Sequence, residues 1–178
     1  MAKHVQIKGL DELLRKVQNL EKAVQDEVQL EVEIAAFRMD ELAKQNIRSQ
    51  NIIGVTSDVL KGQAVIKVAD GEYRVVNNTY YSVFQEFGTG ARVQVPPGWE
   101  DVAIVWKDYQ RGNFAQFVDK MQEWCKVKGI EPGNAYIIAV SILHNGIKAR
   151  PFFIPAFDVI EVELPKRIKE IINDALKS

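Results

Sequence analysis

The feature of the sequence that most constrains the fold is a helical apolar repeat in the first quarter of the chain. Apolar residues recur there every three or four positions, at Leu10, Leu13, Leu14, Val17, Leu20, Val24, Val28, Val32, Ala35, Met39 and Leu42. This spacing predicts a long amphipathic helix whose pattern fades near residues 46–51. Leu30, Ile34 and Phe37 form a second apolar face. This face either packs in the core of the same chain or contacts a neighbouring chain, and the spacing leaves both interpretations open.

The middle of the chain predicts a β-hairpin. Two short segments, 64–69 and 72–77, are rich in β-branched residues. Asp70 and Gly71 lie between them and form a dipeptide that is typical of tight hairpin turns.

Several shorter elements are expected in the rest of the chain. Helices are predicted over 80–87, ending at Gly88, over 114–127, ending near Gly129, and over 136–143. A last helix is predicted to start at Pro155 and to be kinked or split at Pro165. A strand is expected over 101–107. Residues 91–113 otherwise have the composition of a loop, which is long for a compact domain. We expect this loop to be mobile in the free chain and partly ordered by neighbouring molecules.

Length and charge bound the classes of function. A chain of 178 residues suits a single domain over residues 1–178. The formal net charge of -1 gives no electrostatic case for DNA, RNA or an anionic membrane as the main partner. The single cysteine excludes an intrachain disulfide, and the first residues lack the apolar core of a signal peptide. Synthesis in a reducing cytoplasm is therefore expected.

The sequence offers few groups for catalysis. His4 and His144 are far apart in the sequence and make a poor metal site, whereas His144 suits the end of a helix. Cys125 has apolar neighbours at helical spacing, which favours a buried thiol. We therefore expect no catalytic residue, no cofactor and no metal site. Two other classes stay open: a nucleic-acid-binding module that uses Tyr80, Tyr81 or Trp106, and a hydrolase that uses Asp101 or Asp108.

Two aromatic motifs carry the strongest functional signal. The first is YYSVFQEFGTG at residues 80–90, and the second is ARPFFIPA at residues 149–156. The glycines of the first permit a sharp turn, the prolines of the second stiffen an apolar segment, and each aromatic residue suits either a core or a subunit interface. The candidate turn and subunit-interface residues are Tyr80, Tyr81, Phe84, Phe87, Gly88, Thr89, Gly90, Trp99, Trp106, Pro151, Phe152, Phe153 and Pro155.

These motifs, in this order and after GLDELLRKVQNL near the N-terminus, resemble the neck or tail-completion family of tailed bacteriophages. That family comprises head–tail joining proteins grouped with minor tail proteins. The resemblance covers nearly the whole chain at a coarse level. The chain departs from the family after the first helix, where NIRSQNIIGVTSDVLKG lacks the Pro-x-x-Thr-Gly segment of many members.

The resemblance implies an α+β fold, in which a long N-terminal helix packs on a small, mainly antiparallel sheet, with additional helices and a C-terminal helix. It implies a structural virion protein without enzyme activity, which forms a ring of six or twelve copies in the neck. The ring would join the DNA-filled head to the tail and let DNA pass without reading its sequence. Its neighbours would be head-closure or connector proteins and tail-tube or tail-terminator proteins. A tail terminator or a minor tail component is the alternative within this class.

Overall fold

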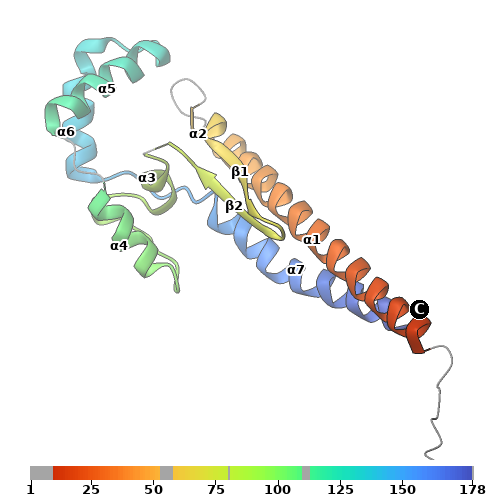
Figure 1. The fold of residues 1–178 in the computed structure, drawn as a ribbon. Coiled ribbons are helices and arrows are strands. Elements are labelled where there is room, and N and C mark those ends of the chain that lie inside the picture. The colour runs from red at the N-terminus through yellow and green to blue at the C-terminus, as the bar shows by residue number, and fades with distance from the viewer. Residues whose placement is uncertain (1–9, 53–57, 80, 110–112, 178) are drawn as a thin grey trace, which may run out of the picture.

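The computed structural model consists of two long helices, a small sheet and a lobe of shorter helices (Figure 1). It describes residues 10–52, 58–79, 81–109 and 113–177, with side chains described from residue 21 onward except at 106–109. Tyr80 and His4 therefore lie outside the described residues.

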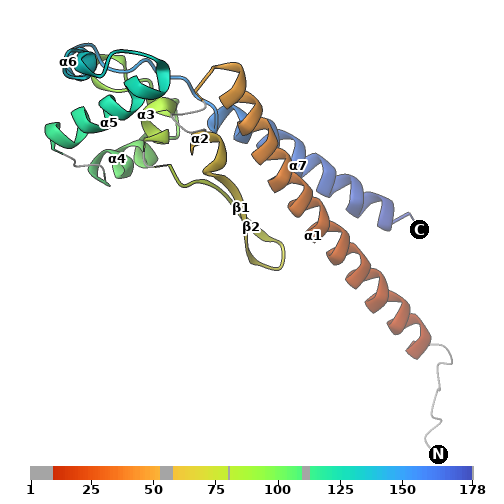
Figure 2. The same ribbon diagram turned by 90° about the horizontal axis from the view of Figure 1, so that it is seen from above.

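Helices α1 (Leu10–Ser49) and α7 (Ile154–Ala175) run antiparallel and side by side (Figures 1 and 2). Their contact forms the main apolar core, whose buried residues are Ala35, Met39, Ala43, Ile47, Ile52, Val59, Phe152, Ala156 and Ile160. Alanines on both helices let the backbones approach closely. The predicted long helix is confirmed, and Asn51 just beyond its end has a φ of 54°, which no longer fits a right-handed helix.

Helix α7 begins with Pro155 in its first turn, where the missing N–H of proline costs no helical hydrogen bond. The helix continues without interruption past Pro165, so the predicted split does not occur. Arg38 of α1 forms an exposed ion pair of 2.7 Å with Glu163 of α7.

The sheet described by the structure is a two-stranded antiparallel hairpin that packs along α1 (Figure 1). Strand β1 (Gln63–Ala69) pairs with β2 (Glu72–Asn77) around the predicted turn, where Gly71 has a φ of 73°. The Tyr73 hydroxyl on β2 donates a hydrogen bond of 2.8 Å to Glu33 on α1. The α+β class, with a long helix on a small antiparallel sheet, is therefore confirmed.

Short helices flank the hairpin and lead toward the lobe: α2 (Asp58–Lys61), α3 (Ser82–Phe87), the 3-10 turn η1 (Gly90–Arg92) and α4 (Glu100–Tyr109). The strand expected over 101–107 is wrong, because these residues lie in α4. Glu100 and Asp101 occupy the first turn of α4, where negative charge complements the helix dipole. The segment 91–113 thus contains a helix, residues 110–112 lie outside the described residues, and the mobility of the segment stays a prediction.

The lobe consists of α5 (Phe114–Lys128), the 3-10 turn η2 (Pro132–Asn134) and α6 (Ala135–Asn145). Asn113 caps α5, because its side chain accepts the Gln116 N–H at 2.9 Å and the Gln116 side chain accepts the Asn113 N–H. Gly129 ends α5 in the left-handed conformation, with φ 68° and ψ 24°. Both predicted helices are confirmed.

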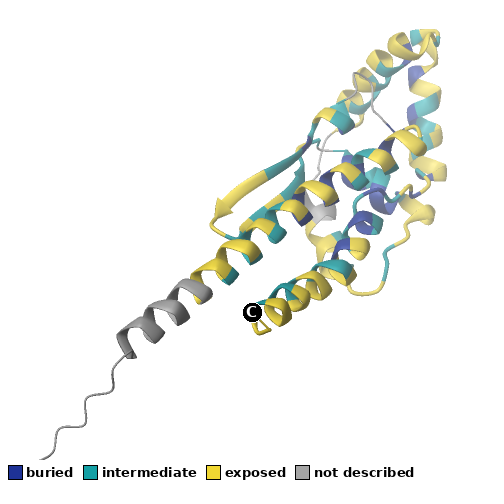
Figure 3. Cartoon of the chain, turned by 90° about the vertical axis from the view of Figure 1, so that its right-hand side faces the viewer, coloured by how far each residue is buried: buried dark blue, intermediate teal, exposed yellow. Residues whose placement is uncertain are grey.

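The buried residues gather in the middle of the molecule, where α1, α7 and the segment before α7 meet (Figure 3). Apolar side chains on α6, on α4 and in the middle of α1 are exposed. The fold thus places the two sequence motifs at its centre and leaves apolar surface on its outer helices.

Candidate functional site at the junction of the two motifs

The two motifs, which are distant in the sequence, bond directly to each other. The Thr89 N–H donates to the Ile147 carbonyl at 2.9 Å, and the Ile147 N–H donates to the Thr89 hydroxyl oxygen at 2.7 Å. Further along, the Arg150 N–H donates to the Gln85 carbonyl at 2.6 Å. We call residues 81–90 and 146–157 together the motif junction.

Glycines make this close approach possible. Gly88 ends α3 with φ 77° and ψ -173°, and a Cβ at this position would lie 2.5 Å from the Arg92 carbonyl oxygen. Gly146 ends α6 with a φ of 71°, and its Cβ would overlap the Thr89 carbonyl oxygen. Gly90 also has a positive φ, of 59°. The predicted helix end at Gly88 is confirmed, although its ψ is extended and not that of a left-handed helix.

A buried carboxylate, that of Glu86, fastens the junction. Its Oε2 accepts the N–H groups of Phe152 and Phe153, and its Oε1 accepts the N–H of Ile154, each at 2.9 Å. These donors lie at the start of α7, where backbone N–H groups have no acceptor within the helix. A negative charge at this end is also favoured by the helix dipole. Glu86 therefore joins α3 to the start of α7.

The surroundings of Glu86 disfavour its charged form. The residue is 5% exposed, and this burial raises the pKa of its carboxyl above the ordinary value. The three backbone hydrogen bonds act in the opposite direction, and repulsion from Asp158 adds a smaller upward effect. The effect of burial is the largest, so the pKa is raised on balance.

Sequence reasoning missed Glu86, although two signals pointed to it. Glu86 is an acid inside a short helix that is otherwise rich in apolar residues. The N-cap of α7 is Phe153, whose side chain cannot accept a hydrogen bond from the first turn. A helix start without its own capping side chain requires an acceptor from elsewhere in the fold.

The aromatic residues of the junction pack against the core of their own chain. Phe152 is buried in the main core, and Phe87 is buried in a second cluster beside it. Phe84 and Trp99 pack against that second cluster. The Trp99 and Phe157 rings meet edge to face, with centroids 5.3 Å apart. These contacts fix the position of the turn relative to α7.

The other predicted site residues lie around this centre or outside it. Those that are half-buried at the junction are Tyr81, Pro151, Phe153 and Pro155. Trp106 lies in α4, and its side chain, like the whole of Tyr80, is outside the described part of the chain. The other predicted residues lie at or beside the motif junction, and their aromatic side chains are divided between the main core and the second cluster.

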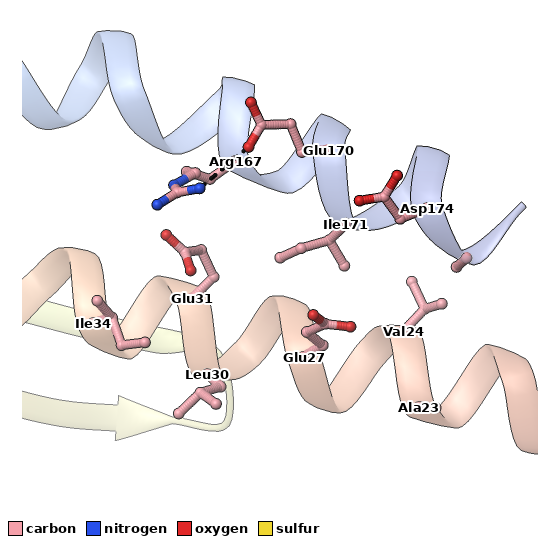
Figure 4. Close-up of a pocket in the computed structure, with 11 residues that line it drawn as sticks. Ala23, Val24, Glu27, Leu30, Glu31, Ile34, Arg167, Glu170, Ile171 and Asp174 are labelled. Atoms are coloured by element: carbon pink, nitrogen blue, oxygen red, sulfur yellow. Dashed lines mark hydrogen bonds and ion pairs between the residues drawn. The ribbon is translucent and has the colours of Figure 1, made fainter. Parts of the chain in front are cut away.

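A second candidate region is an open groove between the middle of α1 and the C-terminal half of α7 (Figure 4). It has a volume of about 560 Å³ and is lined by Ala23, Val24, Glu27, Leu30, Glu31, Ile34, Arg167, Glu170, Ile171, Asp174 and Ala175. In Figure 4, Ile171 points toward α1, and Glu31 lies opposite Arg167. This open mixture of apolar and charged side chains suits contact with a protein better than enclosure of a small molecule.

The described residues hold few of the groups that chemistry requires. Within residues 10–52, 58–79, 81–109 and 113–177, no group of three or more His, Cys, Asp or Glu side chains is placed to hold a metal ion. The Cys125 thiol is buried, and His144 is exposed near the end of α6. No helix in the part of the chain that the structure describes is long and apolar enough to cross a membrane.

Comparison with known proteins concerns the first half of the chain. No curated protein and no solved structure matches the chain. Residues 11–88 match the family model described as "Bacteriophage HK97-gp10, putative tail-component". The match begins in α1 and ends at Gly88, so it includes the hairpin and α3. Through residues 11–88, the chain thus matches the HK97 gp10-like family of phage tail components.

Proposed function

We propose that this chain is a structural virion protein that forms a ring in the neck of a tailed bacteriophage, between the DNA-filled head and the tail. The observation that carries the proposal is the motif junction. The YYSVFQEFGTG and ARPFFIPA motifs, which resemble the neck family, are bonded to each other at the centre of the fold through Gln85 and Glu86 of the first motif. The family match over residues 11–88 supports the broader class of tail component.

In this proposal the junction is the rigid part of each subunit, and the exposed helices contact neighbours. Six or twelve copies surround a lumen, with head-closure or connector proteins on one side and tail-tube or tail-terminator proteins on the other. DNA passes through the lumen without sequence readout. The small net charge of -1 is compatible with passage, because tight retention of DNA requires many basic contacts to phosphate. The chain is made in the host cytoplasm before it enters the virion.

A second candidate function is that of a tail terminator or another minor tail component. The description of the matching family as a tail component favours it. The two candidates share the virion class and differ in the position of the protein along the neck and tail.

Electron microscopy of lysates tests both candidates. The phage that encodes the chain receives a stop codon at Gln18, and a plasmid copy of the gene serves as the control that restores particles. DNA-filled heads lying apart from finished tails are expected for the neck ring. Tails of wrong length would place the protein at the tail terminus instead. Normal infectious particles without the protein would refute both.

A further inference from the structure

Helix α6 exposes apolar side chains although its sequence is typical of a buried helix. Its 11 residues, Ala135–Asn145, include no Asp, Glu, Lys or Arg. Tyr136, Ile137 and Leu143 are nevertheless 60%, 67% and 63% exposed, whereas Ala135 and Ala139 are buried. A helix that is apolar around most of its circumference is normally covered on all sides. We call Tyr136, Ile137 and Leu143 the α6 face.

A second exposed apolar surface lies on α1. Leu30, Ile34 and Phe37 are 55%, 49% and 54% exposed, and their spacing of four and three residues places them in one line along the helix. The hairpin and α7 bond to α1 through Glu33 and Arg38, which are not in this line, and Leu30 and Ile34 line the open groove beside α7. We call Leu30, Ile34 and Phe37 the α1 stripe. The interpretation in which this face packs in the core of its own chain is therefore wrong.

The two surfaces agree in spacing. On α6, Tyr136 and Leu143 of the α6 face and the half-buried Val140 between them repeat the spacing of four and three residues found in the α1 stripe, and Ile137 lies beside this line. Seven residues of α-helix rise by about 10 Å, so both apolar lines have the same length. Two helices with such matching ridges can pack side by side.

The two surfaces are also complementary in charge. Residues 21–37, which contain the α1 stripe, include five acidic residues and one lysine, a net charge of -4. Residues 114–150, which contain the α6 face and its flanking segments, include five basic and three acidic residues, a net charge of +2. Opposite net charge on the two segments that carry the apolar surfaces favours the approach of one segment to the other and disfavours the pairing of either with itself.

We propose that the α6 face of one copy docks on the α1 stripe of the next copy. The inference rests on the proposed ring and assigns its subunit interface. In Figures 1 and 2, α6 lies well away from the exposed part of α1, so one chain cannot cover its own surfaces. A contact between two different surfaces repeats head to tail and forms a ring when its rotation closes, whereas a two-fold dimer pairs a surface with itself.

Cross-linking in phage particles tests the proposal. A phage with the stop codon at Gln18 is complemented by a double variant, Ile34→Cys with Ile137→Cys, and its particles are treated with a short bismaleimide. Each copy then bonds to two others, so denaturing electrophoresis should show a ladder that ends at the number of copies in the ring. Cys125 is buried and should not react.

Matched controls separate this contact from accidental ones. Each single-cysteine variant should remain monomeric, because head-to-tail contact never brings two copies of one position together. The double variant Ile34→Cys with Lys169→Cys should also remain monomeric. Lys169 is exposed on α7 and, by helical spacing, points away from the side of α7 that lines the groove with Arg167.

The outcomes distinguish the interface from the function. A dimer of either single variant would reveal a two-fold contact and overturn the proposal. A bond from Cys at position 34 to a different virion protein would overturn it as well. Particles that contain the chain but give no ladder would refute the contact between the α6 face and the α1 stripe, without contradicting the proposed neck function. Normal particles that lack the chain would refute the proposed function.

Two substitutions at one exposed position give a second test that does not depend on cross-linking. Ile137→Glu places a negative charge opposite the acidic surroundings of the α1 stripe, whereas Ile137→Lys places a positive one there. Complementation by the Glu variant should give a titre about tenfold lower than complementation by the Lys variant. Equal titres would overturn the proposal.

Discussion

Replacing Glu86 with alanine removes the carboxylate that holds the start of α7. Three backbone N–H donors, those of Phe152, Phe153 and Ile154, then lose their acceptor. Phe152 and Ile154 are buried, so water reaches their N–H groups poorly. A buried donor without a partner costs about 1–3 kcal/mol. Even at the lower end for each donor, Glu86→Ala should reduce the free energy of unfolding by about 3 kcal/mol.

Glutamine at the same position tests the hydrogen bonds at nearly constant side-chain size. Its carbonyl oxygen can accept the two N–H groups that Oε2 of Glu86 now accepts. Its amide nitrogen faces the third donor, that of Ile154, and cannot accept a hydrogen bond from it. One lost acceptor predicts a loss of about 1 kcal/mol, so the Gln variant should lie between the wild type and the Ala variant.

Urea unfolding at neutral pH, followed by circular dichroism, measures these losses. Glu161, an exposed acid on α7, provides the matched control, and Glu161→Gln should change the free energy of unfolding by less than about 0.5 kcal/mol. If Glu86→Ala lies within about 0.5 kcal/mol of the wild type with an unchanged slope, the assignment of Glu86 as the fastening residue is refuted. Equal losses of unfolding free energy in the Ala and Gln variants would refute the expectation that Ala leaves three donors without an acceptor and Gln leaves one.

Three further predictions concern the junction. Because burial raises the pKa of Glu86, its folded state binds the proton more tightly than the unfolded state, in which a Glu pKa is about 4.3. This contribution to stability is present at acid pH and is lost as the pH rises through the raised folded pKa. In urea titrations, the free energy of unfolding of the wild type should therefore exceed that of Glu86→Gln by more at about pH 5 than at about pH 8. A larger difference at about pH 8 would contradict the raised pKa. Gly146→Ala should lower the free energy of unfolding, measured by thermal unfolding, by more than about 2 kcal/mol, because the added Cβ overlaps the Thr89 carbonyl oxygen. Gly98 also has a positive φ but lies in open space, so Gly98→Ala should lower it by only about 1 kcal/mol. Trp99→Ala should cost about 2 kcal/mol in urea unfolding through its lost contact with the Phe157 ring, and a loss below about 0.5 kcal/mol would count against that packing.

The elements that the sequence predicted correctly have local signals. The spacing of apolar residues along α1, the turn at Gly71 and the stop at Gly129 each depend on neighbours within a few positions. The error at 101–107 has a local cause too, because a short run of branched apolar residues suits either a strand or a helix. There the packing of Ala103 against the second cluster, which the sequence pattern does not contain, accompanies the helix.

The features that the sequence did not reveal are non-local. Glu86 accepts its hydrogen bonds from residues about 66 positions later, and no periodic pattern links the two segments. Gly146 ends a helix, as its local sequence suggests, but its contact with Thr89 depends on how the lobe returns to the core. The spacing of Leu30, Ile34 and Phe37 defined a face without saying what covers it. A spacing pattern specifies which side chains lie together, whereas the partner of that surface is set by the assembled structure.

The motif junction controls the relative position of both proposed docking surfaces. Glu86 holds the start of α7, and α7 packs along the α1 helix that carries the α1 stripe. Gly146 ends α6 in contact with the Thr89 carbonyl, so the same junction sets the direction of the α6 face. In a head-to-tail ring, the angle between the two contact surfaces of one subunit determines how many copies close the ring. In the proposed ring, a buried junction between the two surfaces would fix this angle, and the aromatic and glycine-rich motifs would then serve assembly even though they lie mostly in the interior.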